Sequence, residues 1–110
     1  MPVHYKMTEL SIGPPLEVST TETRLLSIPY DPEGSGINAV SAVVRLLHMA
    51  TLALTAVQPT IGAVSNNSAV VTLDCTALGV LRGEWYELMV TYTLTNGEER
   101  SGTLGVRVVA

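Results

Sequence analysis

Histidine and cysteine are the residue types best suited to metal binding and nucleophilic chemistry, and the chain contains His4, His48 and Cys75. Neither histidine has a carboxylate, a thiol or a second imidazole at a spacing typical of metal ligands, so we expect no metal site. Cys75 ends an alternating segment on its apolar side, and no motif places a base near it. We therefore expect an inert core thiol rather than a nucleophile.

The hydroxyl and carboxylate residues give no catalytic pattern either. The sequence lacks a G-x-S-x-G elbow, an S-x-x-K motif and a glycine-rich phosphate loop. Glu84 with Glu87 and Glu98 with Glu99 flank an expected strand start and an expected turn, so both pairs are predicted to be surface charges. We expect no enzymatic activity and no cofactor; a small β-sandwich enzyme remains an alternative whose nucleophile and base cannot be named.

The composition suits one compact domain without bound metal or disulfides, since the chain has 110 residues, of which 46% are hydrophobic and 15% charged. The net charge is −4 and the basic residues are scattered. No basic stripe is therefore available to bind the phosphates of nucleic acid, and we expect no nucleic-acid partner.

Two segments are candidates for targeting or membrane insertion. The first ten residues, MPVHYKMTEL, carry polar and charged groups where a signal peptide has an apolar core, so secretion by that route is not expected. Residues 37–57 are long and apolar enough to resemble a membrane span. Arg45 and His48 lie near their middle, where a charge costs about 2.5–3.5 kcal/mol to insert, so no span is predicted.

Turn-forming residues recur about every ten positions after residue 15, which is typical of a β-sandwich or barrel. They fall at residues 31–36, 58–59, 65–68, 82–83 and 96–97. We predict an all-β, immunoglobulin-like sandwich of about seven antiparallel strands over residues 16–110, preceded by an extended arm over residues 1–15.

Alternation of apolar and polar residues supports the strands. The expected inward faces contain Val40, Ala42, Val44 and Leu46; Val71, Leu73 and Cys75; and Tyr86, Leu88, Val90, Tyr92 and Leu94. Residues 51–55 also alternate and are expected to form a strand. A helix over residues 38–57 is the main competing interpretation, because Ala, Leu, Met and Arg favour helices.

The turn at Asn96 and Gly97 predicts a hairpin whose register can be worked out. A two-residue loop would set the apolar face of one strand over the polar face of the other. A three-residue loop over 95–97, with Gly97 left-handed, instead pairs Leu88 with Leu104, Tyr86 with Val106 and Tyr92 with Arg100. We predict the three-residue loop.

Trp85 and Met89 fall on the opposite face of the same strand from Tyr86 and Leu88. Large apolar side chains on an outer face suggest a contact surface. The alternative is that an arm or loop of the same chain covers them.

Residues 80–90, with the sequence VLRGEWYELMV, resemble the corner between the E and F strands of immunoglobulin-like and fibronectin-like sandwiches. The resemblance implies that Tyr86 is a tyrosine-corner residue whose hydroxyl bonds to upstream backbone. The disulfide pair and core Trp of antibody domains are missing. Over residues 37–110 the order of strands and turns also resembles small immunoglobulin-like structural proteins of tailed-phage virions.

That resemblance implies a non-enzymatic virion component of the capsid decoration, neck or tail, located in the virion and assembled in the host cytoplasm. Its partners would be a larger capsid or tail protein, copies of itself, or both. A carbohydrate- or surface-binding immunoglobulin-like module is the alternative, with Trp85, Tyr30 and Tyr5 as stacking residues.

The N-terminal arm is a candidate for docking because it alternates yet closes with two prolines that cannot join a sheet interior. Its alternating apolar residues are Val3, Tyr5, Met7, Leu10 and Ile12. A strand of this kind can add to the sheet edge of a neighbouring subunit. A frayed or intramolecular first strand is the alternative.

Deleting residues 1–12 is expected to leave the domain folded and to abolish oligomerisation or binding to the larger partner. Circular dichroism and size-exclusion chromatography with light scattering check the two parts. Unfolding of the truncated chain would make the arm a strand of its own domain, and normal assembly would make it dispensable.

Overall fold

The computed structural model describes residues 10–11, 15–30, 32 and 36–110. Nine strands and one short helix account for most of this part of the chain. They are β1 (Leu10–Ser11), β2 (Leu16–Val18), β3 (Thr23–Pro29), β4 (Ala39–His48), β5 (Ala53–Leu54), β6 (Thr60–Ile61), β7 (Ser68–Asp74), α1 (Cys75–Leu78), β8 (Trp85–Leu94) and β9 (Glu99–Val108). The predicted all-β class is confirmed, and the helix alternative for residues 38–57 is wrong.

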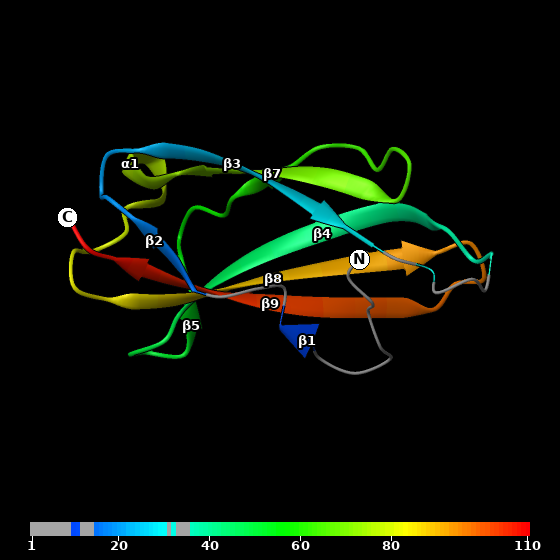
Figure 1. Ribbon diagram of the computed structural model, residues 1–110. Helices are drawn as coiled ribbons and strands as arrows, with labels where there is room; N and C mark the ends of the chain where they lie inside the picture. Colours follow the sequence, from blue (N-terminus) through cyan, green and yellow to red (C-terminus); the bar gives the residue numbers. More distant parts are fainter. Residues whose placement is uncertain (1–9, 12–14, 31, 33–35) are drawn as a thin grey trace.

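The strands form two sheets that face each other across the core (Figure 1). One sheet has six strands in the order β1-β9-β8-β4-β5, with β2 also pairing with β9, and the other has the order β3-β7-β6. The expectation of antiparallel pairing is wrong for β2, which runs parallel to β9. β1, within the predicted arm, also runs parallel to β9. Because β2 runs in the same direction as β9, it ends beside the C-terminus, where the Thr20 N–H donates to the Ala110 carbonyl at 2.8 Å. From there the chain turns into β3 of the other sheet.

The core lies between the inward faces of the long strands. The predicted inward residues of β7 and β8 are all buried, namely Val71, Leu73, Tyr86, Leu88, Val90, Tyr92 and Leu94. Cys75 is buried as well, although it begins α1 instead of ending the strand as predicted. In β4 the prediction fails for Val40, which is 56% exposed. A β-bulge between Ala39 and Ser41 shifts the alternation by one residue, so Ala39 takes the inward place instead.

The β8–β9 hairpin has the predicted three-residue loop. Leu88 pairs with Leu104, Tyr86 with Val106 and Tyr92 with Arg100. Gly97 adopts the left-handed φ of 86° that the turn requires, and its N–H donates to the Leu94 carbonyl at 2.9 Å. The prediction holds because a shift of one residue would have turned an entire apolar face to water.

Two buried tyrosines of β8 form hydrogen bonds between their hydroxyl groups and backbone groups of other segments. Tyr86 accepts a 2.9 Å hydrogen bond from the N–H of Leu81, five residues upstream, as the tyrosine-corner resemblance implies. Tyr92 donates to the carbonyl of Ile28 in β3 and so links the two sheets. The ring of Tyr86 also stacks on His48, with ring centroids 4.8 Å apart.

Replacing Tyr86 with Ala is expected to lower the free energy of unfolding by about 3–5 kcal/mol, because a buried aromatic ring is removed. Tyr86→Phe keeps the ring and leaves the Leu81 N–H without its partner, so its loss is expected to be about 1–3 kcal/mol. Denaturant unfolding of both variants measures the difference. A loss below about 1 kcal/mol for Tyr86→Ala would contradict the buried position.

Candidate functional site

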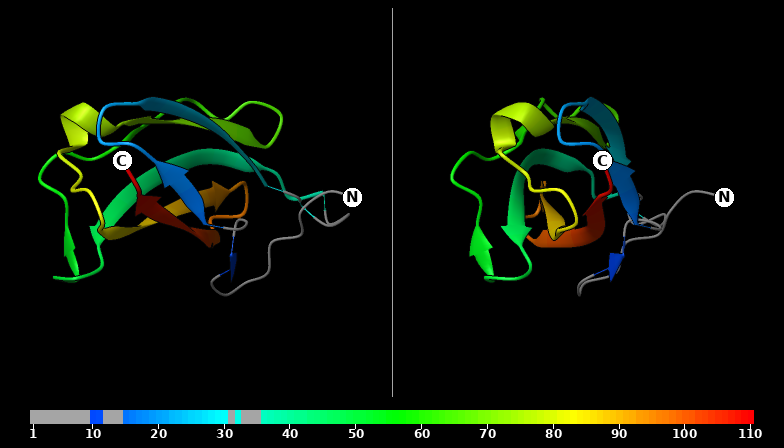
Figure 2. Two further views of the ribbon diagram at one scale, coloured as in Figure 1. Left: turned by 60° about the vertical axis from the view of Figure 1, so that its left-hand side comes forward. Right: turned by 90° about the vertical axis from the view of Figure 1, so that its left-hand side faces the viewer.

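The segment that follows β4 presents apolar side chains to solvent. We call residues 49–57 the apolar hairpin; it contains no Asp, Glu, Lys or Arg. Leu52 is 70% exposed and Leu54 is 54% exposed, and Met49 and Val57 are also exposed. β5 lies inside this hairpin and extends away from the body of the two sheets (Figures 1 and 2). An exposed group of large apolar residues of this kind is typical of a protein contact surface.

The hairpin has a defined turn, although its strand is shorter than the sequence predicts. Alternation predicts a strand over residues 51–55, whereas only Ala53 and Leu54 pair with the end of β4. The Leu52 N–H donates to the His48 carbonyl at 2.8 Å, and Leu52 adopts a left-handed φ of 56°. That conformation costs a residue other than glycine about 1–2 kcal/mol, so neighbouring contacts must hold it.

One glutamine at the end of the hairpin supplies several of these contacts. The Gln58 Oε1 accepts from the Leu46 N–H at 2.8 Å. Its Nε2 donates to the Leu46 carbonyl at 3.2 Å, the Thr55 carbonyl at 2.8 Å and the Thr55 Oγ1 at 2.9 Å. The amide therefore pairs with β4 as a neighbouring strand would, and it fastens the returning arm of the hairpin.

A histidine and a glutamate hold the other side of the apolar hairpin, where it leaves β4. The His48 Nε2 lies 2.9 Å from the Glu84 Oε1, and the His48 Nδ1 lies 3.4 Å from the Thr51 Oγ1. Because Glu84 is 36 residues away in sequence, the pairing of β4 with β8 is what brings it to His48. This cluster anchors the hairpin to the β8 strand; in the described part of the chain no group of three possible metal ligands occurs.

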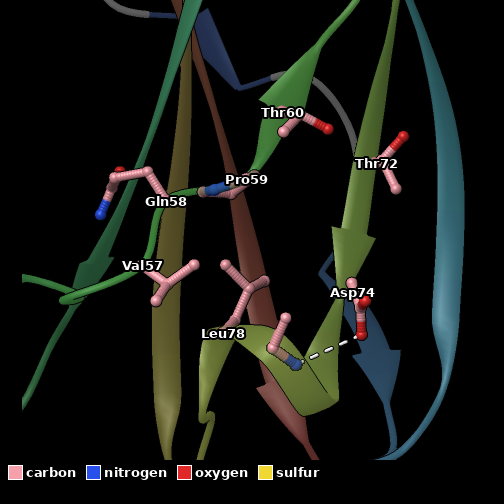
Figure 3. Close-up of a pocket in the computed structure, with 8 residues that line it drawn as sticks. Val57, Gln58, Pro59, Thr60, Thr72, Asp74 and Leu78 are labelled. Atoms are coloured by element: carbon pink, nitrogen blue, oxygen red, sulfur yellow. Dashed lines mark hydrogen bonds between the residues drawn. The ribbon is translucent and has the colours of Figure 1, made fainter.

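A shallow recess of about 230 Å³ lies beside the base of the hairpin (Figure 3). Its walls are mostly apolar and come from Val57, Gln58, Pro59, Thr60, Thr72, Asp74, Ala77 and Leu78. The Asp74 carboxylate caps α1 by accepting from the Ala77 N–H at 3.3 Å. Asp74 is the one ionisable residue among the eight that line the recess.

The residues predicted to contact partners lie apart from the apolar hairpin. Trp85 is 44% exposed on the outer face of the six-stranded sheet, and half-buried Met89 shares that face. The Arg107 guanidinium lies 5.8 Å from the Trp85 ring centroid, and both Trp85 and Pro15 border Gly105. Leu10 lies in β1, where its backbone pairs with β9. The predicted arm contacts Val3, Tyr5, Met7 and Ile12 fall outside the described residues.

The prediction of Tyr30 as a sugar-stacking residue is wrong. It is buried, and its ring centroid lies 5.8 Å from that of Tyr92. The proposed stacking residue Tyr5 lies outside the described residues. A single exposed ring, that of Trp85, is left from the proposed set, and Arg107 already lies over it.

Three further titratable groups with shifted pKa values lie outside the apolar hairpin. Cys75 is buried in the core as predicted, and desolvation raises the pKa of its thiol, with smaller effects from Glu22 and Asp74. The Arg100 guanidinium, 2.8 Å from Glu98, lowers the pKa of that carboxyl group. A hydrogen bond from the Ser19 N–H, followed by one from Arg24, lowers the pKa of Glu22.

Replacing Gln58 with Leu is expected to destabilise the domain by about 1–3 kcal/mol, because partly buried backbone groups lose their partners. The effect should be largest at the hairpin, so the Thr55 amide should exchange with solvent faster. Thermal unfolding and amide exchange by NMR measure the two effects, with Thr60→Val as the control at a nearby exposed position. Unchanged exchange at Thr55 would show that Gln58 does not order the hairpin.

No protein-family model, curated protein or solved structure matches the chain. Within the residues that the structure describes, there is no helix both long and apolar enough to cross a membrane. The function must therefore be inferred from the residues themselves, among which the apolar hairpin is the candidate site.

Proposed function

We propose that the two sheets form an immunoglobulin-like sandwich. The order β3-β7-β6 corresponds to strands B-E-D of that fold, and the order β9-β8-β4-β5 corresponds to G-F-C-C′. The hydrogen bond from the Leu81 N–H to Tyr86 occupies the place of the tyrosine corner before strand F. Strand order and corner together support this assignment.

On this framework we propose a non-enzymatic structural protein of a tailed-phage virion, acting in capsid decoration, the neck or the tail through protein–protein contacts. The observation that carries the proposal is the apolar hairpin, which polar side chains hold in a fixed shape while Leu52 and Leu54 face solvent. Exposing leucines in an ordered loop does not stabilise an isolated domain. It does stabilise a contact in which a partner covers them.

The N-terminal arm is proposed as a second contact with the larger capsid or tail protein. Leu10 and Ser11, the part of the arm described before Pro15, pair with Gly102 and Thr103 of β9. The alternating residues Val3, Tyr5 and Met7 suit addition to a sheet edge of that partner.

The test uses particles assembled by co-expressing this chain with the virion proteins encoded beside it. The double variant Leu52→Ser/Leu54→Ser is expected to reduce the amount bound to purified particles at least about tenfold, because two buried leucines contribute more than 1.4 kcal/mol. The matched control is Leu81→Ser/Val109→Ser, which changes two other exposed apolar residues and should bind normally.

Quantitative mass spectrometry of gradient-purified particles gives the copy number of each variant. Absence of the unmodified chain from particles would overturn the virion role. Binding on a glycan array that is lost in Trp85→Ala would favour the carbohydrate-binding alternative, and equal binding by all variants would show that the hairpin makes no contact.

A further inference from the structure

The three-stranded sheet has a long open edge at β3. Among the residues that the structure describes, β3 pairs with β7 on one side and no strand pairs with its other side. The edges of the six-stranded sheet are partly covered, since β1 and β2 pair with β9 at residues 102–103 and 106–108, and β5 pairs with Leu47 and His48 of β4. Seven residues of open edge are an unusual exposure for a soluble domain, because unpaired N–H and C=O groups attract another strand.

The register shows which backbone groups point outward from β3. The Tyr30 N–H donates to the Asn67 carbonyl at 2.7 Å, and the Cys75 N–H donates to the Glu22 carbonyl at 3.0 Å. Hydrogen-bonded pairs alternate along an antiparallel ladder, so residues 22, 24, 26, 28 and 30 bond toward β7. Thr23, Leu25 and Ser27 therefore direct both their N–H and their C=O groups toward the open edge.

From this edge we infer that β3 pairs with β3 of a second copy of the chain, antiparallel across a twofold axis at Leu25. Thr23 of each copy then faces Ser27 of the other, and Leu25 faces itself. Each outward N–H of these residues donates to a carbonyl of the other copy. A register centred on Ser27 would instead place the Leu25 carbonyl opposite Pro29, which has no N–H to donate.

The side chains also match in the Leu25-centred register. Leu25 is 66% exposed, and the two leucines cover each other on the outer face. Arg24 faces Leu26 rather than another cation, and its charge is already paired with Glu22 at 2.8 Å. No like charges oppose each other, so the edge is compatible with its own copy. The contact is small, and we expect a weak, concentration-dependent dimer.

Amide hydrogen exchange by NMR tests the pairing directly, over a concentration series from roughly 1 µM to 1 mM. The amides of Thr23, Leu25 and Ser27 are expected to become protected as concentration rises. Those of Arg24 and Leu26 bond to β7 and should be protected throughout. Sedimentation equilibrium follows the dimer in the same samples. A monomer with three exposed amides at every concentration would overturn the proposal.

Two substitutions at the axis give independent readouts. Leu25→Lys brings two ammonium groups together and should keep the chain monomeric, whereas Leu81→Lys, at another exposed leucine, should dimerise normally. Leu25→Cys should form an intermolecular disulfide with oxidised glutathione, since paired Cα atoms about 5.5 Å apart suit the bond. Native Cys75 is buried, and Leu81→Cys is the control.

A chain lacking residues 1–9 separates this dimer from contacts of the arm. The β3 pairing should survive that deletion. If deletion removes the protection of Leu25, the edge is covered by residues 1–9 and the proposal is wrong. If Leu25→Cys forms no disulfide while Leu81→Cys does, the twofold register is wrong. Neither result bears on the virion role, because particle binding through the apolar hairpin is measured separately.

Discussion

The alignment of β8 between β4 and β9 is the constraint on which the rest of the domain depends. Side chains alternate along a strand, so this one alignment decides that Tyr86, Leu88 and Tyr92 all enter the core. It also brings Tyr86 beneath Leu81, Tyr92 to β3 and Glu84 to His48. The hydrogen bonds that fix the corner, join the sheets and anchor the apolar hairpin thus follow from a single register.

The sequence predicts those features that depend on strong local patterns. The hairpin register could be predicted because the alternation on both sides of Gly97 leaves one loop length that buries both faces. The bulge at Val40 could not be predicted, because Ala39 and Val40 are both apolar and either could face inward. The parallel pairing of β1 and β2 depends on where the chain crosses between sheets, which no short pattern encodes.

The candidate site was missed for a related reason. Residues 51–55 alternate as a buried strand would, yet Thr51 and Leu52 lie in the turn and only Ala53 and Leu54 form a strand, which is exposed. Its order comes from Gln58, a residue that belongs to no motif, and from His48 with Glu84, which are far apart in sequence. The scarcity of charge is a sequence signal that could have indicated the apolar surface. Between Arg45 and Arg82, Asp74 is the only acidic or basic residue apart from His48.

The absence of Asp, Glu, Lys and Arg from residues 49–57 sets the physical character of any contact made through the apolar hairpin. With no charge to steer it, association should be slow and almost indifferent to ionic strength. The attraction between buried leucines is largely entropic near room temperature and weakens on cooling. An assembly held by this hairpin would therefore withstand high salt and lose its subunits in the cold.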